Sequence, residues 1–198
     1  HGPRVLVDKK VVTAKIVCWL DDYSRYICHV EAFENERLPA IEAALTKAMA
    51  KCGRPNAILV DNGKVYSSKT LMLACSTLGI RKMHSRPYHP ESKGKQERLF
   101  RTVRSQLLNE VENLVEAMPI LRLNQLLQAW ALQYHKSEHS EMGQGQTPEK
   151  RFSIARMDYV PQEILEEAFL QWEIRRVSRQ GRIEFAGNKY WADPSLAG

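Results

Sequence analysis

A short apolar run ends in a carboxylate, and a second carboxylate follows at the start of a long helical pattern. Residues Ala57–Val60 are all apolar, which is typical of a short buried strand, and Asp61 follows directly in the sequence Asp-Asn-Gly. Glu97 lies beyond thirty-five intervening residues, just inside a helical pattern that begins after Pro90. If the strand end packs against the helix start, both carboxylates face one cleft, and this requirement constrains the fold strongly.

Positive charge is concentrated beside these carboxylates. The chain has 29 Lys and Arg residues against 23 Asp and Glu residues, which gives a formal net charge of +6. The segment 81–104 contains eight Lys and Arg residues and two Glu residues, so it accounts for the whole excess. A basic cluster seen alone is as often a solvated helix face, but beside Asp61 and Glu97 it indicates a polyanionic substrate.

Four ordered motifs resemble the core of the retroviral-integrase and transposase superfamily. Its signature consists of two Asp residues and one Glu, with thirty-five residues between the second Asp and the Glu. Asp61 and Glu97 have this separation, and Glu97 lies inside the run PYHPESKGKQER at 87–98. The run WLDDYSRY at 19–26 is similar to the second core strand of bacterial insertion-sequence transposases. The run QTPEKRF at 146–152 is similar to the motif that closes their core.

The resemblance covers residues 1–152 and implies an α/β, ribonuclease-H-like fold with a mixed five-stranded sheet flanked by helices. The sequence pattern agrees, because three meander strands are followed by helix, strand, helix, strand and further helices. Residues 153–198 are expected to form a linker helix over 161–171 and the start of a small C-terminal β-barrel, as in phage-Mu-like transposases. Strand-like stretches lie at 173–177, 182–186 and 189–192.

The helix after Pro90 is expected to run to about Ala117. Its predicted apolar stripe consists of Phe100, Val103, Leu107, Val111 and Leu114. Lys93, Glu97, Arg101 and Arg104 share a neighbouring face at helical spacing. The stripe therefore defines the core side of the helix, and Glu97 is expected to point toward the rim of the cleft.

The resemblance also implies an enzyme, a DDE-type polynucleotidyl transferase that cuts DNA 3′ ends and joins them to target DNA with Mg²⁺ or Mn²⁺. Asp61 and Glu97 are its predicted catalytic and metal-binding residues, and Gly94 is expected to allow a close backbone approach. Seen alone, an Asp-Asn-Gly at a strand end is more often a turn, and a Glu early in a helix usually compensates the helix dipole. Their joint occurrence at the family spacing favours the catalytic interpretation.

DNA contacts are predicted on the basic segment around Glu97. The predicted DNA-binding residues are Lys93, Lys95, Arg98, Arg101, Arg104, Tyr88 and His89. The cations would contact phosphates, which position a duplex without reading its sequence, whereas Tyr88 and His89 resemble the loop that touches the DNA end in integrases. Expected partners are the element ends, the target DNA and further copies of the chain on DNA. His84 and His89 have no third partner at metal spacing, so zinc is not expected.

The third carboxylate of the family signature has no clear counterpart in this chain. In the family it lies on the first strand, and insertion-sequence relatives often follow it almost at once with the His-Gly-Pro sequence found here at residues 1–3. We therefore expect the first Asp upstream of His1. Asp21, at the end of the second strand, and Asp8, in a hairpin turn, are the candidates within the chain, although the family uses the Asp21 position structurally.

Two other functions stay open at this point. A different ribonuclease-H-like nuclease would share the fold, but the run at 87–98 and the pair Thr147-Pro148 argue against it. A non-catalytic DNA-binding or assembly module with the same fold is supported only by the absence of a first Asp.

Composition indicates the cellular location of the protein and the state of its cysteines. No apolar run approaches the length of a membrane span and no signal peptide is present, so a cytoplasmic, nucleoid-associated bacterial protein is expected. The four cysteines, Cys18, Cys28, Cys52 and Cys75, form no C-x-x-C pair and are expected to be buried free thiols.

Overall fold

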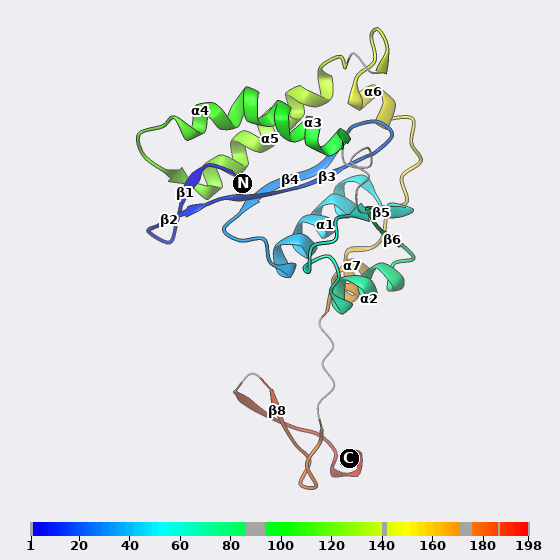
Figure 1. Cartoon of the computed structure of the whole chain (residues 1–198). Helices are drawn as coiled ribbons and strands as arrows, with labels where there is room; N and C mark the ends of the chain where they lie inside the picture. The colour runs from blue at the N-terminus through cyan, green and yellow to red at the C-terminus, as the bar shows by residue number, and fades with distance from the viewer. Residues whose placement is uncertain (1, 86–93, 140–141, 171–175, 186, 198) are drawn as a thin grey trace.

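The computed structural model describes residues 2–85, 94–139, 142–170, 176–185 and 187–197 (Figure 1). The elements before residue 86 are β1 (Arg4–Val7), β2 (Lys10–Thr13), β3 (Lys15–Leu20), β4 (Ile27–Phe33), α1 (Leu38–Cys52), β5 (Ala57–Val60), α2 (Lys69–Thr77) and β6 (Arg81–His84). Next come α3 (Gly94–Val103), the π-helix η2 (Arg104–Leu108), α4 (Asn109–Glu112), β7 (Met118–Pro119), α5 (Ile120–Lys136), α6 (Pro148–Phe152) and α7 (Gln162–Ala168). The last elements are β8 (Arg182–Phe185), β9 (Asn188–Trp191) and the 3-10 turn η4 (Pro194–Leu196). In this described part of the chain, no helix is long and apolar enough to cross a bilayer.

The strands pair in both orientations, as predicted, but in separate hydrogen-bonded ladders. β1 pairs antiparallel with β2 and parallel with β7, β3 is antiparallel to β4, and β5 is parallel to β6. The predicted turn at Asp8 is confirmed, since Asp8 and Lys9 connect β1 to β2 with φ angles of 45° and 64°, as a two-residue type I′ turn requires. Among the described strands the predicted five do not form one continuous ladder, because β3 and β5 share no hydrogen bonds.

Side-chain packing on α1 joins the β3–β4 and β5–β6 ladders instead. On α1, Ile41 packs with Val17 of β3, whereas Leu45 packs with Ile58 and Val60 of β5. On the opposite side of the β3–β4 ladder lie α3, α4 and α5, so helices cover both faces (Figure 1). The buried residues of this second layer include Val5, Ile27, Val30, Leu99, Val103, Leu123 and Leu127.

The long helix after residue 93 departs from its predicted stripe. Buried residues on this helix are Leu99, Val103, Leu108 and Val111, while Phe100 and Leu107 are half-buried and Leu114 is 52% exposed. The predicted stripe therefore holds at Val103 and Val111, and Phe100 packs partly against the core. It is wrong within the π-helical turn η2, where Leu108 is buried more fully than Leu107, and at Leu114, which lies beyond the end of α4. The indole Nε1 of Trp130 donates to Gln106 Oε1 at 2.9 Å, so a tertiary contact stabilises this turn.

The segment 146–152 closes the core through a stack of three rings. Thr147 caps α6 by accepting the N–H of Lys150. The ring of Tyr26 stacks between His135, at a centroid distance of 3.8 Å, and Phe152, at 4.2 Å. His135 is only 2% exposed, and its Nε2 accepts the N–H of Ile27 at 3.0 Å. The imidazole must be neutral at Nε2 to accept this hydrogen bond.

His135 makes the stability of the fold depend on pH. Burial lowers the pKa of His135 to about 4, and the nearby Lys51 acts in the same direction. The unfolded chain protonates this side chain near pH 6.5. The stabilisation is therefore complete above about pH 6.5 and is lost as the pH falls toward 4, with a total loss of about 3 kcal/mol.

Urea unfolding at about pH 7.5 and about pH 5 measures this effect. His135→Gln supplies an amide oxygen for the N–H of Ile27 and cannot titrate, so its free energy of unfolding should change less between the two pH values. An equal change in the two proteins would show that His135 is not the group responsible.

Helix α7 packs into the core rather than standing apart as a linker. Leu165 is fully buried, in one cluster with Leu45 of α1 and Leu71 of α2. The segment before α7 is held by Arg54, whose guanidinium pairs with Asp158 at 2.5 Å and donates to the carbonyl of Leu78 at 2.6 Å. The predicted domain boundary between residues 152 and 153 stays a prediction. Helix α7 follows this boundary in the chain, but its buried residues contact the core that precedes it.

The described C-terminal strands form a hairpin and no closed barrel. β8 and β9 are antiparallel, and Gly181 precedes them with a φ of 77°. A Cβ at Gly181 would lie 2.4 Å from the carbonyl oxygen of Ala192, so this close approach requires glycine. Of the strand predicted at 173–177, residues 173–175 lie outside the described residues, and residues 176 and 177 are not in a strand.

Candidate metal and DNA site

Asp61 lies where the parallel strands β5 and β6 end side by side, and hydrogen bonds connect the two ends. The N–H of Ser85 donates to the carbonyl of Val60 at 2.9 Å. Nδ1 of His84 lies 3.0 Å from the carbonyl oxygen of Asp61, and the side-chain amide of Asn62 donates to the carbonyl of Ser85 at 3.0 Å. Carboxyl ends of neighbouring parallel strands are the usual place for ligands in α/β sheets. Hydrogen bonds to the end of β6 therefore hold the backbone at Val60, before Asp61, and at Asp61 itself, and the side chain of Asn62 after it.

The Asp61 carboxylate is oriented by the glycine that follows it. Oδ1 accepts the N–H of Gly63 at 2.8 Å. A Cβ at Gly63 would lie 2.8 Å from the same oxygen, so any side chain there would displace the carboxylate. This hydrogen bond leaves the second carboxylate oxygen, Oδ2, unused. The Asp-Asn-Gly sequence thus forms a turn that also presents one carboxylate oxygen.

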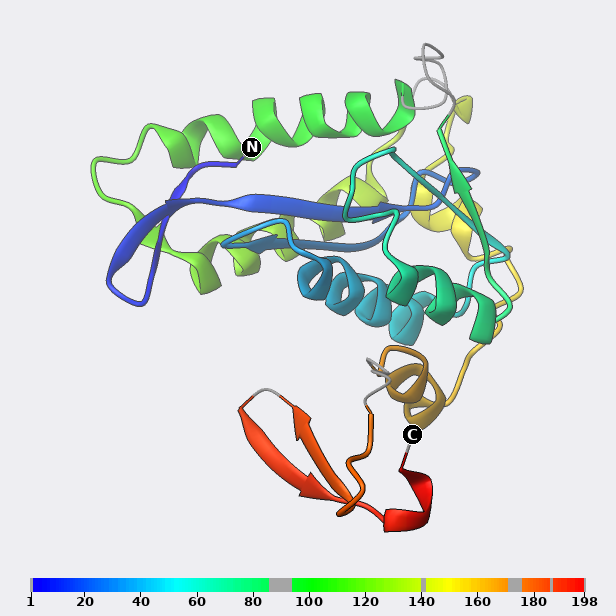
Figure 2. The ribbon, with the colours of Figure 1, turned by 60° about the horizontal axis from the view of Figure 1, so that its bottom comes forward.

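Glu97 is exposed in the first turn of α3, whereas Leu99 and Val103 bury the other side of this helix. Lys95 connects the first turn to the β3–β4 turn through an ion pair with Asp22, at 2.7 Å between Nζ and Oδ2. Figure 2 shows α3 beginning on the same side of the molecule as the end of β6. A Cβ at Gly94 would meet no described atom within 4 Å, and the predicted close backbone approach there stays a prediction.

Asp61 and Glu97 fit a hard divalent cation in their donor chemistry, since Mg²⁺ and Mn²⁺ favour carboxylate oxygens. Within the ranges that the structure describes, no three His, Cys, Asp or Glu side chains are grouped to hold a metal ion. A two-metal site therefore needs further carboxylate ligands beyond this pair. The assignment of Asp61 and Glu97 as metal ligands stays a prediction.

Asp21 is engaged in the turn between β3 and β4. Its Oδ2 accepts the N–H and the hydroxyl of Ser24 at 2.8 and 2.6 Å. Its carbonyl accepts the N–H of Arg25, and its N–H donates to the carbonyl of Tyr26. Ser24 is fully buried, and Arg25 has a φ of 62°. These contacts favour a structural role for Asp21 over that of a third metal ligand.

The predicted DNA-binding cations differ in their surroundings. Arg98 and Arg101 are exposed on α3. Arg104 pairs with Glu112 at 3.3 Å, and Lys95 is engaged by the ion pair described above. Three predicted contacts, Tyr88, His89 and Lys93, lie outside the described residues. Arg98, Arg101 and Arg104 are therefore the exposed arginines among the described cations predicted to contact phosphate, whereas Lys95 is half-buried.

Sequence reasoning missed the hydrogen bonds that hold the Asp61 turn. His84 was considered only as a zinc ligand, and neither Asn62 nor Ser85 received a role. The available signal was the parallel pairing of the strands 57–60 and 81–84, because it places the residues after each strand next to each other.

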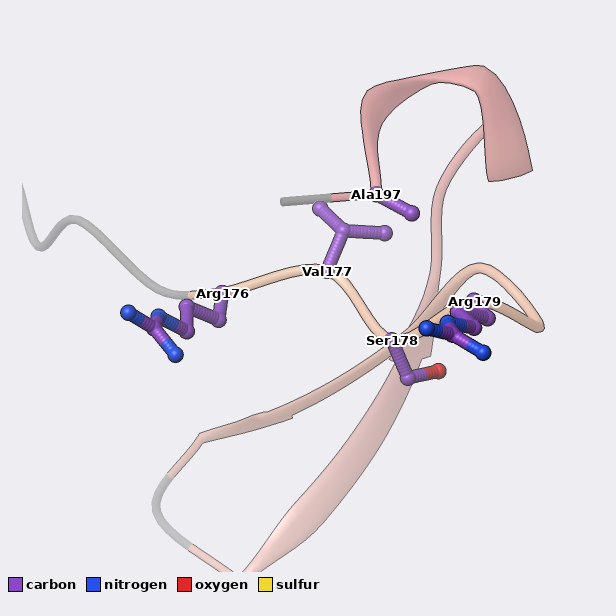
Figure 3. Close-up of a pocket in the computed structure, with 5 residues that line it drawn as sticks. All are labelled: Arg176, Val177, Ser178, Arg179 and Ala197. Carbon is purple, nitrogen blue, oxygen red and sulfur yellow. The ribbon is translucent and has the colours of Figure 1, made fainter.

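A second basic feature lies beside the C-terminal hairpin. Arg176 and Arg179 line a pocket of about 410 Å³ together with Val177, Ser178 and Ala197 (Figure 3). Figure 3 shows the two arginines on either side of Val177 and Ser178. This pocket is remote in sequence from Asp61 and takes no part in the site around it.

Comparison with known proteins shows which families the core is similar to. Residues 6–90, which contain Asp61 and His84, match the family described as "Integrase core domain". This segment of the chain is similar to integrase cores of the retroviral type. The chain has 29% identity over 73 residues with the Intracisternal A-particle Pol-related polyprotein of Mouse intracisternal a-particle MIA14, covering 37% of this chain and 8% of that protein.

A second relative is the Gag-Pro-Pol polyprotein of Human T-cell leukemia virus 3 (strain Pyl43). It is 32% identical over 83 residues, which are 42% of this chain and 6% of the polyprotein. The chain therefore spans less than a tenth of the length of these two curated relatives. Both are retroviral, whereas the resemblance to bacterial insertion-sequence transposases stays a prediction.

The predicted fold of the chain is confirmed by its similarity to a solved structure. A chain in the cryo-EM structure of the simian T-cell lymphotropic virus intasome in complex with PP2A regulatory subunit B56 gamma superposes with a TM-score of 0.59. The alignment covers 97% of this chain and 64% of that chain at 20% identity. The likeness shows the ribonuclease-H-like fold and nothing about activity.

Proposed function

We propose that this integrase core catalyses DNA transposition or integration as a DDE-type recombinase. It would cut DNA 3′ ends and join them to target DNA. The observation that carries the proposal is the Asp61 turn, which presents a carboxylate oxygen at the ends of two parallel strands inside the segment that matches integrase cores. Glu97 follows at the family spacing on an exposed helix face beside Arg98 and Arg101.

In this mechanism Asp61 and Glu97 hold the divalent cations, which would be Mg²⁺ or Mn²⁺. Such cations, when bound, activate the attacking hydroxyl and stabilise the leaving oxygen of an in-line displacement at phosphorus. The protein holds Asp61 Oδ1 through Gly63 and leaves Oδ2 for a ligand. Arg98 and Arg101 bind phosphates of the DNA backbone and position the duplex. Because the Asp21 carboxylate accepts two hydrogen bonds from Ser24, we do not assign Asp21 as the third metal-binding carboxylate.

Assembly on DNA is part of the proposal. One solved structural neighbour comes from the structure of an intasome, and this likeness supports assembly of copies of the protein on DNA.

The test is a joining assay with the full-length protein that contains this chain. A labelled donor DNA end and a target plasmid are incubated with Mg²⁺, with Mn²⁺, or with a chelator. Joined product is expected with either metal and none with the chelator, because the carboxylates cannot act without cations. DNA binding without joining under all metal conditions would overturn the proposal and would favour the non-catalytic assembly module.

A further inference from the structure

We infer that His84 is a positioning residue that holds Asp61 in place for metal binding. This role rests on the proposed function, because it concerns the orientation of a proposed metal ligand. His84 is the last residue of β6, pairs with Val60 in the ladder and has an exposed side chain. Its Nδ1 lies 3.0 Å from the carbonyl oxygen of Asp61.

This contact defines the tautomer of the imidazole. A carbonyl oxygen can only accept a hydrogen bond, so Nδ1 of His84 must carry the proton and donate it. In the neutral ring Nε2 is then an acceptor. Neutral histidine without such a contact favours the proton on Nε2, so the hydrogen bond to Asp61 reverses the usual preference.

The hydrogen bond from His84 acts on the Asp61 carboxylate through the following backbone. Asp61 comes after the last ladder residue, Val60, so the ladder does not constrain its carbonyl. The carbonyl of Asp61 belongs to the peptide that joins Asp61 to Asn62, so the hydrogen bond from His84 restricts the rotation of this peptide. The backbone that follows then presents the N–H of Gly63 to Asp61 Oδ1 at 2.8 Å. Catalytic carboxylates must be held within about 0.5 Å of their working position.

The exposure of His84 separates this role from a contribution to the core. The last strand residue buries little area, so its replacement removes one hydrogen bond at the surface and leaves the cores of α1, α2 and α7 unchanged. Residues that orient metal ligands typically change metal affinity or activity by about 10- to 100-fold when they are replaced. A large effect on metal dependence with a small effect on stability is therefore expected.

Three variants of the full-length protein distinguish the two ring nitrogens. His84→Asn places an amide donor near the position of Nδ1, His84→Gln places its amide near the position of Nε2, and His84→Ala removes both. The Mg²⁺ concentration for half-maximal DNA joining should rise by about 10-fold in the Gln and Ala variants and stay within about twofold of wild type in the Asn variant. Thermal unfolding midpoints should agree within about 2 °C.

Two further readouts do not depend on activity. The affinity for Mn²⁺, measured from the electron paramagnetic resonance of the free ion, should follow the same order of variants. Nitrogen NMR of the wild-type protein, at a pH where the ring is neutral, should show His84 protonated on Nδ1.

The outcomes separate this inference from the proposed function. A wild-type protein that joins DNA, with equal Mg²⁺ dependence in all three variants or an Nε2-protonated His84, would overturn the inference and leave the function intact. A wild-type protein that joins no DNA would overturn the function, while the Mn²⁺ affinities and the tautomer would still decide whether His84 positions Asp61.

Discussion

Glu97→Gln in the full-length protein is expected to lower DNA joining in Mg²⁺ by about 10³-fold. The substitution keeps the size and polarity of the side chain and removes the negative charge that a divalent cation requires. Metal activation of a phosphoryl transfer is worth several kcal/mol in the transition state, and each 1.36 kcal/mol corresponds to a factor of about ten. Because Glu97 is exposed on α3 and contributes nothing to the core, its replacement should leave the fold unchanged.

The measurement is the initial rate of joining of a labelled donor end, with DNA binding recorded in parallel. Glu110→Gln is the matched control, because Glu110 is an exposed carboxylate on α4, further along the same helical segment. It should stay within about twofold of wild type, since it removes the same charge away from the site. Joining at the wild-type rate in Glu97→Gln would remove Glu97 from the metal site and leave the basic face of α3 as a DNA contact only.

Leu165→Ala is expected to lower the free energy of unfolding by about 3 kcal/mol. Leu165 is the fully buried residue of α7 and lies in one cluster with Leu45, Ile58 and Leu71. The truncation removes buried apolar surface and leaves a cavity between α7 and the helices α1 and α2, which the surrounding structure fills only in part. Urea unfolding of the whole chain, followed by circular dichroism, measures the change.

The neighbouring residue provides the control for this experiment. Ile164 is 46% exposed on the same helix, so Ile164→Ala should cost less than about 1 kcal/mol. If both variants have the same small effect, α7 does not pack on the core, and the chain after residue 152 behaves as the separate unit expected from the sequence. A large effect of Leu165→Ala alone makes α7 part of the same folded core as α1 and α2.

Local sequence was sufficient wherever an element depends on its own residues. The strand Ala57–Val60 was predicted with the bounds it has in the structure, because a continuous apolar run ends sharply at the polar Asp-Asn-Gly turn. The two-residue turn at Asp8 followed from the same kind of local signal. The apolar stripe after Pro90 was mispredicted at Leu107, where Leu108 is buried more fully, since regular helical spacing does not anticipate a π-helical turn that the contact between Trp130 and Gln106 stabilises.

The candidate site divides in the same way. The sequence alone singled out Asp61 and Glu97, because their spacing and the basic residues around Glu97 are properties of the linear chain. Only the tertiary structure brought His84 to the carbonyl of Asp61 across 23 residues, and Lys95 to Asp22 across 73 residues. Strand pairing and helix packing determine such contacts, and these depend on the burial of residues far apart in the chain. Residue identities therefore indicated the chemistry of the site. The packing of β5, β6 and α3 decided which side chains hold the Asp61 turn and the start of α3 in place.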